Sequence, residues 1–219
     1  MRFRKLAAIA VAVLGLVTVP KTAAIAADGD DPVRIVGFGD SLMAGYGLNG
    51  PEGFPARLQA ALEARGYNVE ITDAGSSGDT SSGGRARLDW SIPVDEEVDG
   101  VILELGANDA LRGLPPEKTR ENLDAIITRL KERGIEVLLA GMLAPPNLGA
   151  DYESRFNAIY PELARKHNLV LYPFFLDGVT GNPSLLLDDG MHPNAKGINQ
   201  MVNGILPYAE DFLARIEAG

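Results

Sequence analysis

Two residues of the sequence have the types and settings that acyl transfer requires, a serine among glycines and a histidine in a turn-like segment. Ser41 lies in GFGDSLMAGYG, residues 37–47, which directly follows Val33 to Val36, a run typical of a buried strand. His192 lies in DDGMHPN, where Gly and Pro indicate a loop and nothing structural calls for an imidazole. Because a serine hydroxyl needs a base to remove its proton, this pair is typical of a nucleophile and its general base.

A carboxylate usually orients the imidazole in such a pair. Asp189 precedes His192 by three residues, and one turn of chain would bring the two side chains together. Asp188 is one residue out of that register and is the alternative. The other histidine, His167, follows LARK at an expected helix end, where an imidazole has an ordinary structural role.

The negative oxygen that forms when a carbonyl is attacked needs hydrogen-bond donors. Ser41 offers its backbone N–H, which would also carry helix-dipole potential if a helix began there. Gly78, in GSSGDTS, can bring a backbone N–H close to a substrate because it has no side chain, and Asn108, in GANDA, offers an amide donor. A turn glycine and an Asx turn explain Gly78 and Asn108 equally well when each is taken alone.

The elements that must position these residues alternate along the chain. Short aliphatic or β-branched runs predict buried strands at residues 33–38, 69–72, 100–105, 135–140 and 169–172. The segments between and after them predict helices at residues 54–65, 80–90, 116–133, 152–167 and 195–216. This alternation predicts an α/β fold with an open, mostly parallel five-stranded sheet and helices on both faces. Ligands bind such sheets at the carboxyl ends of the strands, where the candidate residues lie.

The first 26 residues differ from the rest of the chain. Arg2, Arg4 and Lys5 precede an apolar run, and small residues surround Ala26, which is typical of a secretory signal peptide. The apolar run spans about 14 residues, fewer than the ~20 that a membrane span needs. We therefore expect residues 1–26 to be removed, by cleavage after Ala26 or Ala27, and residues 27–219 to form one periplasmic or secreted domain.

The composition excludes several kinds of partner and chemistry. The net charge is −10, and it becomes −14 without the four basic residues of the signal peptide. Such an acidic chain is not expected to bind nucleic acid or to insert stably into a membrane, and it favours small neutral or monoanionic substrates. The absence of cysteine excludes thiol catalysis and cysteine-ligated metal. Nothing in the sequence demands more than a monomer.

Four sequence blocks together resemble the GDSL or SGNH hydrolase superfamily. They are GDSLMAGYG with Ser41, GSSGDTS with Gly78, GANDALRG with Asn108, and DGMHPN with Asp189 and His192. More narrowly, SGDTSSGGRARL, ELGANDALRGLPP, FNAIYPELA and DDGMHPNAKG resemble the exported bacterial thioesterase, arylesterase and lysophospholipase group. The resemblance implies a flavodoxin-like three-layer α/β/α fold and a serine esterase that uses no metal or cofactor.

The roles that the resemblance implies agree with those that the residue types suggest. Ser41 attacks an acyl carbonyl, His192 takes its proton, and Asp189 orients His192, while the Ser41 and Gly78 amides and the Asn108 side chain hold the oxyanion.

Residues near the four blocks add three further expectations. An α/β-hydrolase elbow would need G-x-S-x-G, but Met43 stands where its last glycine belongs. Asp40 is then expected only to shape the turn. We further expect the loop with Leu111 and Leu114 to line the acyl pocket.

Two other functions remain as alternatives. Several acidic residues and one histidine could lie near one another at the edge of the sheet, where they would suit a divalent cation and make the chain a metal-dependent phosphoesterase. These residues are Asp40, Asp79, Asp109, Asp188, Asp189 and His192. The second alternative is a non-catalytic periplasmic binding module, which has no use for a base and a carboxylate three residues apart.

Overall fold

The computed structural model describes residues 31–219, so the expected signal peptide lies outside the described residues. Its centre is a five-stranded sheet in the order β2-β1-β3-β4-β5, in which every neighbouring pair is parallel. The strands are β1 (Val33–Gly39), β2 (Val69–Gly75), β3 (Gly100–Glu104), β4 (Glu136–Ala140) and β5 (Val170–Tyr172). The expected open parallel sheet is confirmed.

The observed burial of the strands agrees with their sequence patterns. β3, which is apolar up to Glu104, and most of β4 are buried along their length, because both strands lie inside the sheet and are covered on both faces. The edge strand β2 begins with buried and exposed residues in alternation, as expected where only one face is covered.

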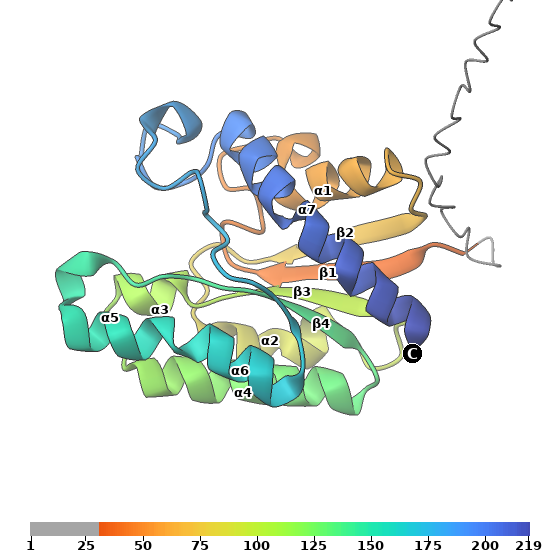
Figure 1. Cartoon of the computed structure of the whole chain (residues 1–219), viewed down its shortest axis with the longest axis horizontal. Helices are drawn as coiled ribbons and strands as arrows, with labels where there is room; N and C mark the ends of the chain where they lie inside the picture. Colours follow the sequence, from red (N-terminus) through yellow and green to blue (C-terminus); the bar gives the residue numbers. More distant parts are fainter. Residues whose placement is uncertain (1–30) are drawn as a thin grey trace, which may run out of the picture.

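Helices cover both faces of the sheet and complete a three-layer arrangement (Figure 1). One face carries α1 (Phe54–Glu63) and the long α7 (Ala195–Ala218), which pack against each other. The other face carries α2 (Ser81–Ser91), α4 (Pro116–Glu132) and α6 (Ile159–His167), with α5 (Ala150–Asn157) at one end. No helix within residues 31–219 is long and apolar enough to cross a bilayer.

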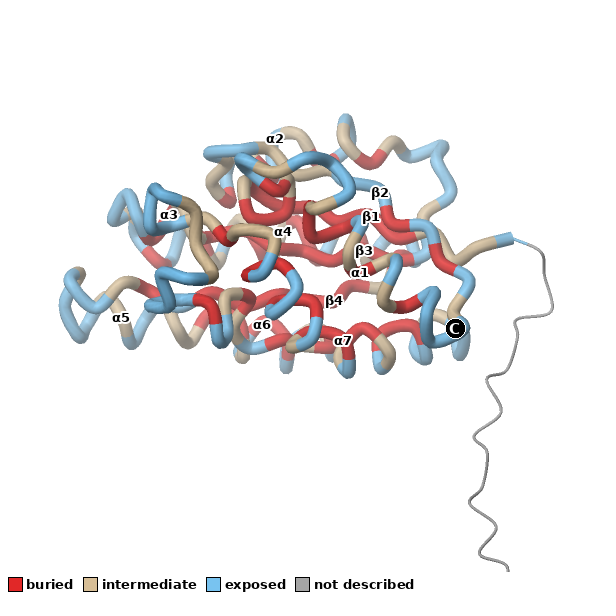
Figure 2. The backbone as a smooth tube through the Cα atoms, turned by 90° about the horizontal axis from the view of Figure 1, so that it is seen from above, coloured by how far each residue is buried: buried red, intermediate tan, exposed pale blue. Residues whose placement is uncertain are grey.

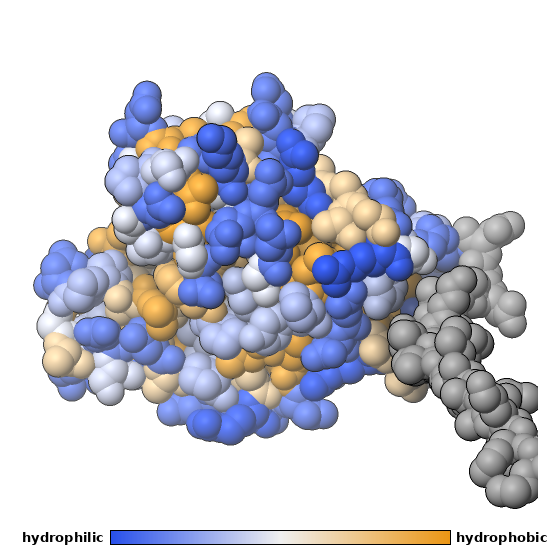
Figure 3. Space-filling model, turned by 45° about the horizontal axis from the view of Figure 1, so that its top comes forward, coloured by the Kyte–Doolittle hydropathy of each residue, from blue (hydrophilic) through white to orange (hydrophobic). Residues whose placement is uncertain are grey.

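The core runs through the sheet and the inner faces of the helices, as the buried segments in Figure 2 show. The surface seen in Figure 3 is mostly hydrophilic, and its hydrophobic side chains form separate patches. Most aliphatic residues of the strands and of the inner helix faces are therefore buried in this core.

Two expected elements differ from the structure. The single helix expected at 152–167 is divided into α5 and α6 at Ala158, because Pro161 has no N–H to donate to the carbonyl of Asn157. A short helix, α3 (Ala107–Leu111), occupies a segment that was expected to be a loop. Within residues 31–219 there are also three 3₁₀ turns, at Gly50–Glu52, Pro146–Leu148 and Pro183–Leu185.

The order of the strands decides which loops meet. Because β1 lies between β2 and β3, the loops that follow these three strands begin side by side at one edge of the sheet. Those loops carry Ser41, Gly78 and Asn108. They meet at the carboxyl ends of the paired strands β1 and β3, where the direction of winding reverses and open α/β sheets bind ligands.

Candidate active site

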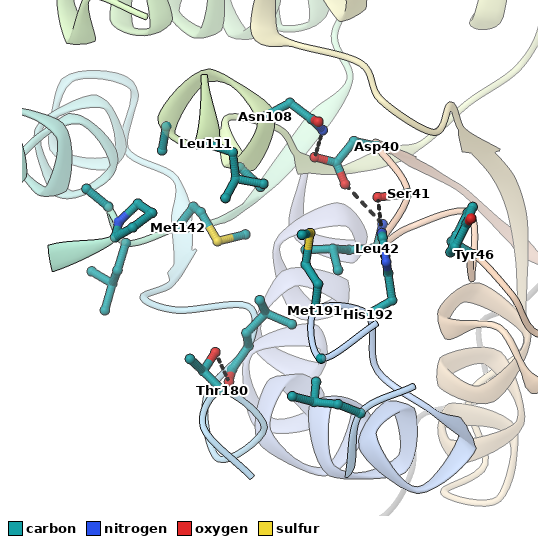
Figure 4. A pocket seen from close by; sticks show the side chains of 18 of the residues that line it. Asp40, Ser41, Leu42, Tyr46, Asn108, Leu111, Met142, Thr180, Met191 and His192 are labelled. Carbon is teal, nitrogen blue, oxygen red and sulfur yellow. Dashed lines mark hydrogen bonds between the residues drawn. The ribbon is translucent and has the colours of Figure 1, made fainter. Parts of the chain in front are cut away.

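Three side chains form a continuous hydrogen-bonded chain at this edge of the sheet. Nε2 of His192 lies 2.9 Å from Oγ of Ser41, and Nδ1 of His192 lies 2.7 Å from Oδ2 of Asp189. Figure 4 shows Ser41 and His192 pointing toward each other. With a proton on Nδ1 donated to the carboxylate, Nε2 is free to accept the serine proton, which is the arrangement that activates a serine nucleophile.

Asp189, and not the alternative Asp188, reaches His192. One Asp189 oxygen also accepts hydrogen bonds from the backbone N–H groups of His192, at 3.0 Å, and Met191, at 2.8 Å. These donors, with the His192 side chain, lower the pKa of Asp189 to about 2. The carboxylate is therefore ionised at neutral pH. Its hydrogen bonds to the Met191 and His192 backbone form a tight turn that places it against the imidazole.

The turn that carries Ser41 is short and does not begin a regular helix. Residues 41–47 form consecutive turns, with the Ala44 N–H donating to the carbonyl of Asp40 at 3.0 Å, and α1 begins only at Phe54. The expected contribution of a helix dipole at Ser41 is therefore wrong. Instead, other backbone N–H groups of this turn donate hydrogen bonds within it.

The backbone N–H groups on either side of Ser41 donate hydrogen bonds. The N–H of Leu42 donates to Oδ1 of Asp40 at 3.0 Å, and the N–H of Asp40 donates to Oε2 of Glu104 at 3.2 Å. Within residues 31–219 the N–H of Ser41 has no acceptor. It is free to bind an oxygen placed beside the serine.

Gly78 and Asn108 lie on the wall of the same cavity as Ser41 and His192. Gly78 has a φ of +85°, a conformation that a side chain would strain, and its N–H has no acceptor in the described part of the chain. Nδ2 of Asn108 donates one hydrogen to Oδ2 of Asp40 at 3.0 Å, which leaves its second hydrogen free (Figure 4). The structure thus brings the three expected donor residues to one cavity.

Asp40 does more than shape the turn, because it lies on a second buried carboxyl that the sequence reading missed. Asp40 and Glu104 are fully buried, and Glu104 lies at the carboxyl end of β3. Burial, and after it the negative charge of Asp40, raises the pKa of Glu104 well above its usual range. The acidic residue in ELGAND, directly after an apolar strand, is the signal that could have identified it.

The cavity beside Ser41 has a volume of about 680 Å³ and is lined mainly by apolar side chains. Its walls include Leu42, Leu111, Met142, Leu143, Pro145 and Leu176. Leu111 therefore lines the cavity as expected. Leu114 does not, because the chain folds back there and its N–H donates to the carbonyl of Asp109 at 2.9 Å.

Tyr46 and the loop after β4 also belong to this site, although neither was predicted from the sequence. The Tyr46 ring lies 4.4 Å from the His192 ring, centroid to centroid, on the side of His192 away from Met142 (Figure 4). The loop segment GMLAPPNLG follows a strand but carries no titratable residue, so only its position after β4 pointed to the site.

The acidic residues considered as metal ligands are engaged elsewhere. Asp79 forms an ion pair with Arg87 at 2.6 Å, and Asp109 accepts hydrogen bonds from Ser81 and Thr119. In residues 31–219 no three acidic, His or Cys side chains converge so that they could hold a metal ion. The geometry thus does not favour the phosphoesterase alternative.

Comparison with known proteins agrees with this geometry. Residues 38–198 match the GDSL-like Lipase/Acylhydrolase family. An arylesterase of Vibrio mimicus is 39% identical over 182 residues, which are 83% of this chain and 86% of that protein.

Two further similarities cover a similar share of the chain. The thioesterase 1/protease 1/lysophospholipase L1 of Escherichia coli K12 is 38% identical over 178 residues, 81% of this chain and 80% of that protein. The crystal structure of AlinE4, an SGNH-hydrolase family esterase, is 43% identical with a TM-score of 0.70, over 83% of this chain and 96% of that one. The chain therefore belongs to the GDSL-like lipase/acylhydrolase family.

Proposed function

We propose that this protein is a serine hydrolase that cleaves carboxylic esters and acyl thioesters through an acyl-enzyme intermediate. The observation that carries the proposal is the hydrogen-bonded chain from Asp189 through His192 to Ser41, at the wall of a largely apolar cavity. The names of the relatives, arylesterase and thioesterase 1/lysophospholipase L1, support the same two substrate classes.

The proposed reaction proceeds in two halves. Oγ of Ser41 attacks the acyl carbonyl carbon while Nε2 of His192 takes its proton, and His192 then gives that proton to the leaving alcohol or thiol. Water then attacks the acyl-serine carbonyl while His192 takes its proton; as the bond to Oγ of Ser41 breaks, His192 gives that proton to Oγ, and the carboxylic acid leaves. Asp189 keeps His192 in the tautomer that accepts at Nε2 and stabilises the imidazolium that forms.

The oxyanion of each tetrahedral intermediate is proposed to bind the N–H groups of Ser41 and Gly78 and the side chain of Asn108. Support for this assignment is that both N–H groups lack acceptors within the described residues, and that Asn108 has one hydrogen left after its bond to Asp40. Each such donor typically contributes about 100- to 1000-fold in rate.

The apolar cavity is the proposed site for the acyl group. It contains no Lys or Arg among its lining residues, and Leu111 and Met142 extend it from Ser41 away from Tyr46 (Figure 4). Apolar side chains around the reacting serine favour a hydrocarbon acyl chain over a charged one. Leu114, behind the wall, is proposed to act only through the position of Leu111.

We further propose that the protein acts as an exported, monomeric enzyme, periplasmic or secreted, after removal of residues 1–26. The signal-like pattern of charged, apolar and small residues supports this placement. Residues 27–219 then form the one catalytic domain.

The test is a rate profile over p-nitrophenyl acyl esters and acyl thioesters of increasing length. We expect the parent protein to hydrolyse both classes, and Ser41→Ala and His192→Ala each to lose nearly all activity while remaining folded by circular dichroism. Full activity in either variant would refute the mechanism. Inactivity of the parent would favour the binding module, and loss of activity on chelation with recovery on adding metal would favour the phosphoesterase.

A further inference from the structure

The two backbone donors of the proposed oxyanion site come from different loops, so something must hold these loops at a fixed separation. The loops touch directly: the N–H of Ser76 donates to the carbonyl of Gly39 at 3.0 Å. A Cβ on Gly75 would lie 2.4 Å from the backbone nitrogen of Ala44. Such close backbone packing leaves no room for a bulky side chain between the loops. Their relative position must therefore be maintained by groups around their contact.

Arg87, on α2, binds both loops with one guanidinium group. Its Nη2 donates to the carbonyl of Gly39 at 2.8 Å, two residues before Ser41. Its Nε donates to Oδ2 of Asp79 at 2.6 Å, one residue after Gly78. Nη1 adds a bond of 2.9 Å to the carbonyl of Ala74, at the end of β2.

The surroundings of Arg87 restrict its movement further. Its side chain is only 17% exposed, and the guanidinium carbon lies 4.1 Å from the centre of the Phe38 ring in β1. Nη1 also donates to the hydroxyl of Ser91 on its own helix at 2.9 Å. The planar fork of arginine sends these hydrogen bonds in fixed directions, which the single ammonium of lysine cannot reproduce.

We propose that Arg87 is a positioning residue that sets the distance between the Ser41 and Gly78 amides and so shapes the oxyanion site. The inference rests on the proposed function, because the amides that Arg87 positions stabilise the transition state of that reaction. Arg87 does not line the cavity, so it acts through the two loops and not through contact with substrate. Its loss should lower the rate of the chemical step and leave substrate binding nearly unchanged.

The decisive variant is Arg87→Lys, which keeps the positive charge beside Asp79 but loses the fork. Arg85→Lys is the matched control, since Arg85 lies on the same helix and donates to Asn122 on α4 instead. A displacement of about 1 Å at the reacting centre costs on the order of 100-fold in rate. We expect kcat of Arg87→Lys on a p-nitrophenyl ester to fall about 10- to 100-fold with KM changed less than about 3-fold.

Phenylboronic acid supplies a readout that a general loss of stability would not move. It forms an anionic tetrahedral adduct with a nucleophilic serine, so its affinity should fall by the same factor as kcat when both are measured well below the melting temperature. Arg85→Lys should match the parent in kcat and in boronate affinity. Asp79→Asn, which weakens one bond of the fork, should show a smaller loss of the same kind and decides the case if Arg87→Lys does not fold.

An unchanged kcat in folded Arg87→Lys would overturn the inference, as would a loss confined to KM with unaltered boronate affinity. If Arg87→Lys does not fold, unchanged kcat in Asp79→Asn would overturn it. The proposed function is judged separately, by hydrolysis in the parent and its loss in Ser41→Ala. An active parent with an insensitive Arg87 therefore refutes the inference alone.

Discussion

Replacing Asn108 by alanine tests the proposed oxyanion site most directly. Nδ2 of Asn108 carries two hydrogens, of which one is donated to Oδ2 of Asp40 at 3.0 Å, and Asn108 lines the cavity. Alanine removes both. Loss of the free donor should raise the barrier by about 2.7–4 kcal/mol, a fall of about 100- to 1000-fold in kcat. KM should change little, because the oxyanion exists only in the transition state and the tetrahedral intermediates.

The lost bond to Asp40 has a separate effect on stability. Asp40 is fully buried, so a carboxyl oxygen left without its donor should lower the free energy of unfolding by about 1–3 kcal/mol. In a protein of this size each kcal/mol shifts the melting temperature by about 2–4 °C. Both effects are measurable, by steady-state hydrolysis of a p-nitrophenyl ester and by thermal denaturation.

Asn122→Ala is the control that separates stability from catalysis. Nδ2 of Asn122 donates to the hydroxyl of Ser81 at 3.1 Å, and Asn122 does not line the cavity. We expect it to lower the melting temperature while kcat stays within about 2-fold of the parent, as for a residue outside the reacting site. A kcat for Asn108→Ala within about 3-fold of the parent, in folded protein, would refute the assignment of this side chain to the oxyanion.

Four further predictions concern the carboxyls and the cavity wall. Asp189→Asn should lower kcat about 10³- to 10⁴-fold, whereas Asp188→Asn should not. Because hydrogen bonding lowers the pKa of Asp189 to about 2, its ionised interactions are lost only as the pH falls through that value. A carboxyl titration of Asp189 by NMR with a midpoint above 4 would contradict this. Burial raises the pKa of Glu104 and so favours its neutral form. Glu104→Gln should therefore melt close to the parent, whereas Glu104→Ala leaves the N–H of Asp40 without its acceptor and should lower the free energy of unfolding by about 1–3 kcal/mol; equal losses in the two variants would argue against a neutral Glu104. Leu111→Ala should shift the preferred acyl length and Leu114→Ala should not, as measured by rates over the ester series; equal shifts would place both side chains on the wall.

The layered fold was predictable because its signals are local. Aliphatic runs such as those at residues 100–105 and 135–140 mark buried strands, and alternation with helices leaves few arrangements beyond a parallel sheet. The expectations that failed depended on single residues within local patterns. Pro161 interrupts a helix that was predicted to be continuous. After β1, residues 41–47 form turns, so no regular helix begins at Ser41.

The candidate site was predictable to the extent that residue type identifies chemistry. A serine among glycines, an amide after a strand and a histidine in a loop that contains Gly and Pro are all recognisable from residue type and setting. Ser41, Asn108 and His192 were therefore predicted. Arg87 was not, because an arginine within a helix resembles an ordinary surface residue until its partners are known. Tyr46 was missed for the same reason, since its contact with His192 arises only in the folded chain.

By itself the sequence determined the strands and most of the helices, and it favoured Asp189 over Asp188 as the partner of His192, because one turn of chain brings residues three apart together. Only the tertiary structure decided that His192 meets Ser41 across 151 residues, and that Arg87 spans the Gly39 carbonyl and Asp79. Periodicity specifies which face of an element is buried. How two loops distant in sequence approach each other depends on strand order and on the packing of α2 and α7, which no local pattern encodes.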